Sequence, residues 1–338
     1  MENILCEYDV VVVGGGISGM AAAIRSKENG IGKVLLLERE DVLGGVLNHC
    51  IHCGFGKEIL GEAVTGSEFV EYLVHKVHKL GIDVKLNTTV LEISKDKEIS
   101  YVNPDEGMKN MKTRAIVLAT GSREKFKGNV SVPLNKFTGI YTSGTAHRFI
   151  NLYGYLPGKK IVIIGSHDSD MIVARRLIIE GAKVEAIIES KDYLNSSQYI
   201  VENIIEAFDI PVKLGYTVNE VLGTERVEGV IISKGGEEES FIKCDSLLIS
   251  VPWIPESALG KKMGLRISNS SETILVNENF ETSESGIFAC GNVLHAYELS
   301  DLATKEGYDY KEIFVSVKFS KFQRYRIKDN FLNSFLLS

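Results

Sequence analysis

The segment YDVVVVGGGISGMAAA, which starts at Tyr8, decides the fold together with LLLERE, which starts at Leu35. Its apolar run Val10–Val13 predicts a buried strand, and the alanine-rich run that follows the glycines predicts a helix. Glu38 ends a second apolar run, 24 residues after Gly14. The order strand, glycine turn, helix, strand and terminal acid is typical of a dinucleotide-binding βαβ unit.

Each glycine of this turn has its own mechanical reason. Gly14 makes the tight turn, Gly16 has no side chain to block a pyrophosphate, and Gly19 lets the helix pack closely on the strand. The start of the helix offers unpaired N–H groups and a partial positive charge to phosphates. Glu38 can accept hydrogen bonds from both ribose hydroxyls of an adenosine, and its charge repels a 2′-phosphate.

Length and composition indicate an ordinary globular protein with two domains. The chain has 338 residues, of which 44% are hydrophobic and 25% charged, and its net charge of −7 argues against nucleic acid as a partner. The acidic start MENILCEYD is not a secretory signal, and no apolar run approaches the roughly 20 residues that span a bilayer. Five cysteines do not make a disulfide framework, so we expect a cytoplasmic protein.

Much of the first unit recurs further along the chain. KKIVIIGSHDSD begins at Lys159, and Glu189 again ends a strand 24 residues after the first glycine, Gly165. The tripeptide VKL occurs at 84–86 and again at 212–214, and each copy opens short alternating strands that predict a β-meander. The sequence therefore predicts an α/β protein with two Rossmann-like dinucleotide-binding domains, each carrying a β-meander.

The chain then returns to the first domain. TSESGIFACGNV, from Thr282 to Val293, predicts a turn, a buried strand that completes the sheet begun at Val10, and a small-residue loop. The second domain is therefore expected to be inserted into the first. We predict a discontinuous first domain at 1–125 and 278–310, an inserted domain at 126–277, and a divergent basic and aromatic tail at 311–338.

The order GGGISG, ATGS, a degenerate second fingerprint and CGNV resembles the pyridine nucleotide-disulfide oxidoreductases, over roughly residues 8 to 307. The resemblance implies FAD in the first domain and NAD(P)H in the second, with hydride passing to the flavin. The stretches GGVLNHCIHCGFG and CGNVLH also resemble the smaller FAD subunits of heteromeric dehydrogenases and oxidases of the glycerol 3-phosphate, sarcosine or opine type.

The resemblance assigns further residues to the FAD site. Asn292 stands where the family usually has an aspartate that binds a ribityl hydroxyl, so this contact loses its charge. The other residues assigned to FAD, beside Gly14, Gly16, Gly19 and Glu38, are Ile17, Ser18, Arg39, Gly45, Val46, Val90, Ala119, Thr120, Gly121 and Gly291.

The first copy contains an insertion, HCIHC at His49–Cys53, for which several interpretations stay open. Its two cysteines have two residues between them, whereas the disulfide reductases of this family have four, so we do not expect disulfide reductase activity. His49 or Cys50 could face the flavin, Cys50 and Cys53 could form a redox-active pair, or the loop could be a polar loop with partly buried thiols. Zinc or an Fe–S cluster needs four ligands, and the other cysteines stand alone, so we predict no metal. An amphipathic helix from Ser67 to Leu80, capped by Ser67, should follow.

The second fingerprint is altered in its phosphate-binding turn. His167 stands where the middle glycine belongs, and Asp170 places a negative charge at the helix start. Gly165 and Glu189 are retained, and Glu189 favours NAD over NADP. Both a functional NAD site and a vacated scaffold stay open.

These features predict an FAD-dependent oxidoreductase that passes electrons between a pyridine nucleotide and a second acceptor or donor. His49, Cys50, Cys53 and His295 are the candidate catalytic residues. The alternative is an FAD-carrying electron-transfer subunit with an unused NAD site, favoured by His167, Asp170 and the basic aromatic tail. The expected partner is a small-molecule substrate or a dehydrogenase subunit, and the sequence leaves open whether the protein forms homo- or hetero-oligomers.

Overall fold

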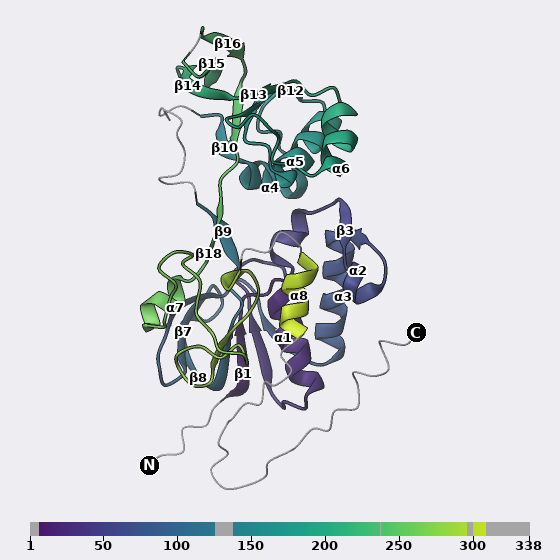
Figure 1. Ribbon diagram of the computed structural model, residues 1–338. Coiled ribbons are helices and arrows are strands. Elements are labelled where there is room, and N and C mark those ends of the chain that lie inside the picture. The colour runs from purple at the N-terminus through teal and green to yellow at the C-terminus, as the bar shows by residue number, and fades with distance from the viewer. Residues whose placement is uncertain (1–6, 126–137, 237, 296–299, 309–338) are drawn as a thin grey trace. The chain divides into compact units, whose positions relative to one another are not determined.

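The computed structural model describes residues 7–125, 138–236, 238–295 and 300–308, so the predicted tail at 311–338 lies outside the described residues. The chain divides into two compact units. Unit 1 comprises Met1–Ser122 and Ile254–Ser338, and unit 2 comprises Arg123–Trp253 (Figure 1).

Unit 1 is built around a seven-stranded sheet in the order β5-β2-β1-β8-β7-β6, with β19 also paired to β8. Strands β1, β2, β5 and β19 run parallel to the second half of β8, whereas β6, β7 and the first half of β8 form the predicted antiparallel meander. The strands are β1 (Tyr8–Val13), β2 (Val34–Leu37), β5 (Asp83–Lys85), β6 (Thr89–Ile93), β7 (Glu98–Asn103), β8 (Gly107–Leu118) and β19 (Ile287–Ala289). The closing strand predicted near Thr282–Val293 is therefore confirmed.

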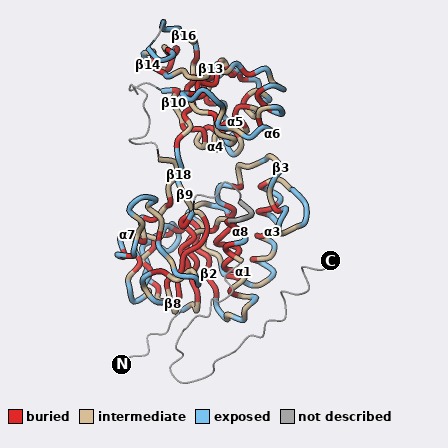
Figure 2. Tube along the Cα trace, viewed as in Figure 1, coloured by how far each residue is buried: buried red, intermediate tan, exposed pale blue. Residues whose placement is uncertain are grey.

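Alternate residues of the central strands fill two cores, as the two-residue period of a strand requires. Val10 and Val12 face the core formed with helices α1 and α3, and Val11 and Val13 face the core on the other side of the sheet. Figure 2 shows these strands as a continuous buried band. The helices of unit 1 are α1 (Ile17–Glu28), α2 (Lys57–Leu60), α3 (Gly66–Lys79), α7 (Ala258–Met263) and α8 (Ser300–Tyr308), with 3₁₀ turns η1 (Gly45–His49) and η3 (Gly291–Val293). Strand β3 (Cys53–Phe55) pairs antiparallel with β4 (Val64–Thr65), and α2 lies between them in the chain.

Unit 2 repeats the plan with a five-stranded parallel sheet, β10-β17-β11-β12-β13, and a three-stranded meander, β14-β15-β16. Its strands are β10 (Ile140–Thr142), β11 (Lys160–Ile164), β12 (Lys183–Glu189), β13 (Val212–Leu214), β14 (Tyr216–Gly223), β15 (Val227–Lys234), β16 (Ser240–Lys243) and β17 (Ser246–Ile249). Its helices are α4 (Ser143–Tyr153), α5 (Asp168–Ile179), α6 (Gln198–Ile200) and the π-helical turn η2 (Val201–Glu206). The prediction of two Rossmann-like units with meanders is confirmed.

The chain passes between the units in two paired strands, β9 (Ser122–Glu124) and β18 (Trp253–Pro255). The predicted crossings lie at 125/126 and 277/278, whereas the structure divides at 122/123 and 253/254. Residues 254–277 belong to unit 1 because Met263, Leu265 and Ile274 are buried in its second core, beside Ile93 and Ile99 of the meander.

Helix α3 begins one residue before the predicted start, and its cap is Thr65 rather than Ser67. The Thr65 hydroxyl accepts the backbone N–H of Glu68, and the Glu68 carboxylate accepts the backbone N–H of Thr65 at 2.8 Å. This reciprocal pair is a capping box. It fixes the helix whose face with Phe69 and Leu73 covers the core beneath the glycine turn.

Candidate functional site

The glycine turn of unit 1 has the close contacts that the sequence predicts. A Cβ on Gly19 would lie 1.9 Å from the carbonyl oxygen of Gly14, so only glycine allows α1 to approach β1 this closely. A Cβ on Gly16 would meet nothing within 4 Å among the described residues, so it would project into open space beside the turn. Gly16 is the N-cap of α1, and the first turn, with Ile17 and Ser18, contains no acidic residue and no side-chain cap. This helix start therefore keeps donors for an anion.

Glu38 lies beside that turn and is only 6% exposed. Its Oε2 accepts the backbone N–H of Gly15 at 2.6 Å, and its Oε1 accepts the backbone N–H of Glu40 at 2.9 Å. An ionised carboxylate has about four acceptor positions, so each oxygen keeps one for a ribose hydroxyl. The neighbouring Arg39 points outward, with 70% of its side chain exposed.

The predicted residues after β8 and β19 lie at the same edge of the sheet as the glycine turn, because these strands run parallel to β1. Ala119 donates its N–H to Val13 at 2.9 Å, and the Thr120 hydroxyl donates to the Glu256 carbonyl at 2.7 Å. Gly121 accepts the N–H of Glu256 at 2.9 Å. The carboxyl ends of parallel strands are where α/β folds bind ligands, so the structure brings these residues together at the expected edge.

One further observation supports an FAD site at this edge of the sheet in unit 1. The side-chain oxygen of Asn292 is buried and has no hydrogen-bond partner among the described residues, while its amide nitrogen is 3.4 Å from the Ser122 hydroxyl. A buried acceptor without a donor is unfavourable by about 1–3 kcal/mol. A ribityl hydroxyl would supply the missing donor, as the resemblance implies.

The remaining predicted FAD residues are spread along the same unit. Gly45 and Val46 begin η1, whose N-cap Gly44 donates its N–H to Gly15 at 2.9 Å, so this loop lies against the glycine turn. Val46 is 45% exposed. Val90 pairs with Tyr101 in the meander and packs against the second core, so its side chain contributes to packing.

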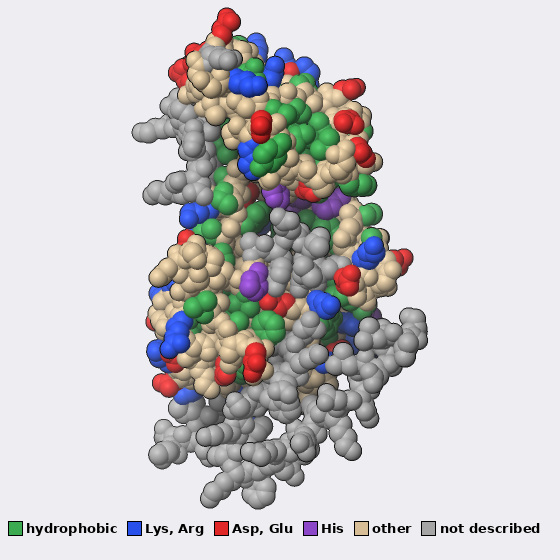
Figure 3. Space-filling model, viewed as in Figure 1, with side chains coloured by type: hydrophobic (Ala, Val, Ile, Leu, Met, Phe, Trp, Pro, Cys, Tyr) green, Lys and Arg blue, Asp and Glu red, His purple; other side chains and the backbone are tan. Residues whose placement is uncertain are grey.

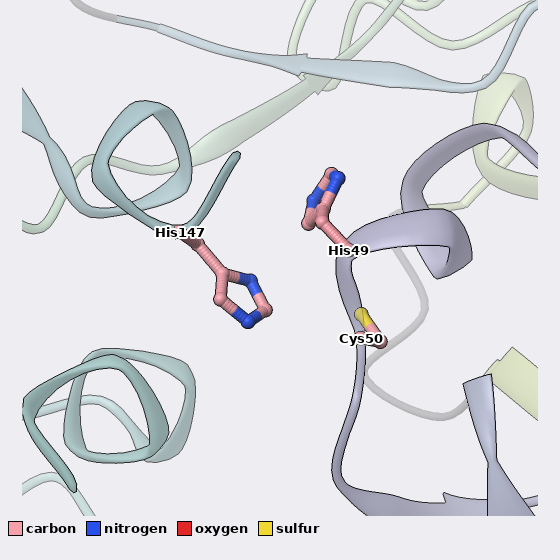
Figure 4. A group of neighbouring side chains, drawn as sticks. All are labelled: His49, Cys50 and His147. Atoms are coloured by element: carbon pink, nitrogen blue, oxygen red, sulfur yellow. The ribbon is translucent and has the colours of Figure 1, made fainter. Parts of the chain in front are cut away.

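The HCIHC segment leaves η1 and enters β3. His49 is the last residue of η1, Cys50 follows it, and Cys53 begins β3. Burial raises the pKa of the Cys50 thiol to about 12, and its sulfur lies 3.5 Å from the Val46 carbonyl oxygen. Cys53 is exposed, and both thiols are free. A neutral Cys50 is a poor nucleophile and a poor metal ligand. Figure 4 shows His49 and Cys50 at this end of η1, and His147 on α4 of unit 2.

His295 lies just after η3, with 63% of its side chain exposed. Its Nε2 is 3.9 Å from the carboxylate of Glu306, which is buried. His295 follows the Gly291 loop in the chain, and its charged neighbour there is Glu306, which no sequence pattern singles out.

Unit 2 reproduces the acid at the strand end. Glu189 is 6% exposed, and its Oε2 accepts the Ser166 hydroxyl at 2.6 Å. The backbone N–H of Lys191 donates to Oε1 at 3.1 Å. Gly165 keeps a positive φ of 98° and lies against Ser250. Glu189 thus lies at the end of its strand and holds the turn residue Ser166, as Glu38 holds Gly15 in unit 1.

The phosphate end of unit 2 is altered. Asp170, at the position of Gly19, is 2% exposed, and its carboxylate accepts the backbone N–H of His167 at 3.0 Å. Burial raises the pKa of Asp170, although hydrogen bonds from Ser250 and from the backbone N–H of His167 oppose this. The carboxylate occupies donors at the start of α5 that a pyrophosphate would use, and it repels an anion while ionised.

A second carboxylate lies at the start of the neighbouring helix. Glu124 accepts the Thr142 hydroxyl and, at 2.8 Å, the backbone N–H of Gly144 in α4. Burial raises the pKa of Glu124, and the charge of Asp170 contributes to this shift. Glu124 also lines a pocket of about 310 Å³ with Ile140, Tyr141, Thr142 and Thr145. The starts of α4 and α5 are thus both occupied by acids, in contrast to the start of α1.

Two site residues were not identified from the sequence. Gly15 holds Glu38, and a Cβ on Gly15 would lie 2.9 Å from that carboxylate, so the second glycine of the GGG run was a readable signal. Glu306 accepts the N–H of Gly291 at 2.6 Å, and no spacing in the sequence connects the two.

Among the described residues, no helix is long and apolar enough to cross a membrane. On the face drawn in Figure 3, the described acidic and basic side chains are interspersed over both units.

Known proteins resemble this chain over most of its length. The ferredoxin–NADP reductase 2 of Bacillus licheniformis is 24% identical over 85% of this chain and 84% of its own. The thioredoxin reductase of Bacillus subtilis is 25% identical over 85% of this chain and 86% of its own.

Solved structures share the fold. The thioredoxin reductase of T. acidophilum has a TM-score of 0.74 at 24% identity, covering 90% of this chain and 96% of its own. The L-proline dehydrogenase of P. horikoshii has a TM-score of 0.66 at 22% identity, covering 89% of this chain but 53% of its own.

The family model for the pyridine nucleotide-disulphide oxidoreductases matches residues 8–307, nearly the whole described region. Its members typically bind FAD and use NAD(P)H, and with the two reductases above the match confirms the prediction of a flavin-dependent, NAD(P)-linked oxidoreductase. This chain belongs to the pyridine nucleotide-disulphide oxidoreductase family.

Proposed function

We propose that unit 1 binds FAD along Gly14–Gly19 and Glu38, and that unit 2 binds NADH in preference to NADPH. The buried, unpartnered oxygen of Asn292 carries the FAD assignment, because a ligand hydroxyl would satisfy it. The buried Glu189 carboxylate supports the preference for NADH, because it would repel a 2′-phosphate.

Each part of the proposed FAD site would bind a different part of the cofactor. The N–H groups at the start of α1 would hold the pyrophosphate, Glu38 the adenosine ribose, and Asn292 a ribityl hydroxyl. Bound FAD supplies the two-electron chemistry, and the protein supplies position and electrostatics. The exposed Val46 and the half-buried, neutral Cys50 line the η1 loop, which lies against the glycine turn through Gly44. A thiol in this state can exclude water but does not offer a proton acceptor.

The electron acceptor is proposed to be a partner protein or a small oxidant rather than a disulfide substrate. The curated relatives are named as reductases of ferredoxin and of thioredoxin, which are proteins. The Cys50–Cys53 pair has two residues between its cysteines, which departs from the four-residue spacing of the disulfide reductases. With its described cysteines free, we place the protein in the cytoplasm.

The absorption spectrum of the purified protein tests this function. We expect a bound flavin that is bleached anaerobically by NADH and more slowly by NADPH, and reoxidised by the acceptor. A colourless protein that does not take up added FAD would refute the assignment to unit 1. A flavoprotein that neither nucleotide bleaches would refute the assignment to unit 2.

Asp170 favours a second candidate function: an FAD-carrying subunit that a partner dehydrogenase reduces, as in the heteromeric dehydrogenases. Its buried carboxylate takes an N–H at the start of α5 that a pyrophosphate needs. The double variant His167→Gly/Asp170→Ala should bind NADH more tightly if the site is only obstructed, with Ser169→Ala on the same helix as a control. Calorimetric titration with NADH decides between the two functions. If neither the wild type nor the double variant binds NADH, the nucleotide pocket has been lost in other ways.

A further inference from the structure

Strand β19 is flanked by two glycines, and a glutamate holds the backbone N–H of each. Glu281 accepts the N–H of Gly286 at 2.8 Å before the strand, and Glu306 accepts the N–H of Gly291 at 2.6 Å after it. The two contacts have the same chemistry but lie at opposite ends of the strand. Only the second lies at the carboxyl edge, where ligands bind.

The loop that Glu306 holds is tightly constrained. Gly291 has a φ of 74°, and a Cβ on it would lie 2.3 Å from the Ser18 hydroxyl in the first turn of α1. Helix α8 carries Glu306, and it packs on α1 so closely that a Cβ on Gly307 would lie 2.6 Å from the Ser18 carbonyl oxygen. Because α8 packs against the first turn of α1, it holds the Glu306 carboxylate next to the Gly291 N–H.

The held loop presents Asn292, whose buried side-chain oxygen has no partner among the described residues. Glu306 is 7% exposed, so its hydrogen bond to Gly291 is shielded from water. Charge-assisted hydrogen bonds of this kind are stronger than neutral ones and fix geometry.

We propose that Glu306 is a positioning residue for the flavin site: its carboxylate holds the Gly291 N–H and thereby sets the Asn292 oxygen in place to accept a hydrogen bond from FAD. This inference rests on the proposed function, because the positioned ligand is FAD. Under this inference His295 is a neighbour of Glu306 and takes no part in the reaction.

Titration of the apoprotein with FAD, followed by flavin fluorescence, tests the inference together with thermal unfolding. Glu306→Ala should weaken FAD binding about 10-fold or more, the order expected for a charged hydrogen bond. Glu306→Gln keeps an acceptor oxygen and should bind within about threefold of wild type, since a neutral acceptor still makes the bond. Glu281→Ala is the matched control, and it should lower the Tm without changing FAD affinity.

A double variant identifies the route of the effect. If Glu306 acts through Asn292, then Glu306→Ala should weaken binding little further once Asn292→Ala is present, because the two effects are coupled. Should Glu306→Ala not fold, Glu306→Met keeps the side-chain volume without the acceptor and is measured instead.

Unchanged FAD affinity in Glu306→Ala or Glu306→Met would overturn the inference. It would also be overturned if Glu281→Ala lost as much FAD affinity as Glu306→Ala, or if Glu306→Gln bound FAD as weakly as Glu306→Ala. A wild-type protein that binds no FAD would instead refute the proposed function, so the two failures are distinguishable.

Discussion

The carboxylate of Glu38 accepts the backbone N–H of Gly15 at 2.6 Å, so the acid expected to hold a ribose also holds the turn that faces the pyrophosphate. Unit 2 repeats this relationship with a side chain, since the Ser166 hydroxyl donates to Glu189 at 2.6 Å. In both units the acid at the strand end accepts a hydrogen bond from the second residue of the turn.

Replacing Glu38 by alanine should therefore weaken FAD binding and loosen the turn. Loss of a charge-assisted contact to the ribose is unfavourable by about 1.5–3 kcal/mol, or roughly 10- to 150-fold in affinity. Flavin titration of the apoprotein measures this effect. Glu189→Ala removes the equivalent acid from unit 2 and should leave FAD affinity unchanged. Full flavin retention in Glu38→Ala would mean that the carboxylate serves the turn alone.

The choice between NADH and NADPH should depend on Glu189. Removing its charge should narrow the preference for NADH by about tenfold, which corresponds to about 1.4 kcal/mol of repulsion of the 2′-phosphate. Rates of anaerobic flavin reduction by each nucleotide give the ratio. Glu185→Ala, on the same strand and paired with Lys183, is the control and should not change it. An equal preference for both nucleotides in the wild type would contradict the prediction.

The sequence was sufficient for the central fold because its signals there are local. Val10–Val13 and the glycine turn specify β1 and α1, and the closing strand at Ile287–Ala289 follows from its apolar run. The capping box of α3 is also visible in the sequence, since Thr65 stands three residues before Glu68, although the predicted cap was Ser67.

Features that depend on contacts distant in sequence could not be predicted in this way. Residues 254–277 have no long strand or helix, and only the burial of Met263, Leu265 and Ile274 against the meander assigns them to unit 1. Glu306 likewise looks like a surface residue of a polar helix, until the packing of α8 on α1 brings it to Gly291.

Asp170 should make unit 2 less stable as the pH rises. Burial raises its pKa, so the ionised form is disfavoured in the folded state. Its contribution to stability is then full below the ordinary carboxyl pKa of about 4 and is lost as the pH rises through the raised value. Asp170→Asn stays neutral, so its Tm should exceed that of wild type at about pH 8 and approach it near pH 4. Thermal unfolding at both pH values measures this.

The control for that comparison lies two residues earlier, in the same first turn of α5. Asp168 starts α5 and accepts the N–H of Ser197 at 2.7 Å, so Asp168→Asn loses a favourable charge at the helix start. Its Tm should not rise at high pH. A Tm of Asp170→Asn below wild type at every pH would show that the Asp170 charge is stabilising, through its bonds to His167 and Ser250.

Alkylation should separate the two cysteines of the HCIHC segment. Thiolates react and thiols do not, and burial raises the pKa of Cys50 to about 12, whereas Cys53 is exposed. Iodoacetamide near pH 8 should therefore modify Cys50 at least ~10-fold more slowly than Cys53, as read for each peptide by mass spectrometry. In urea the difference should disappear, because both thiols then meet water. Faster modification of Cys50 in the native protein would indicate a stabilised thiolate and would restore the interpretation of Cys50 and Cys53 as a redox-active pair.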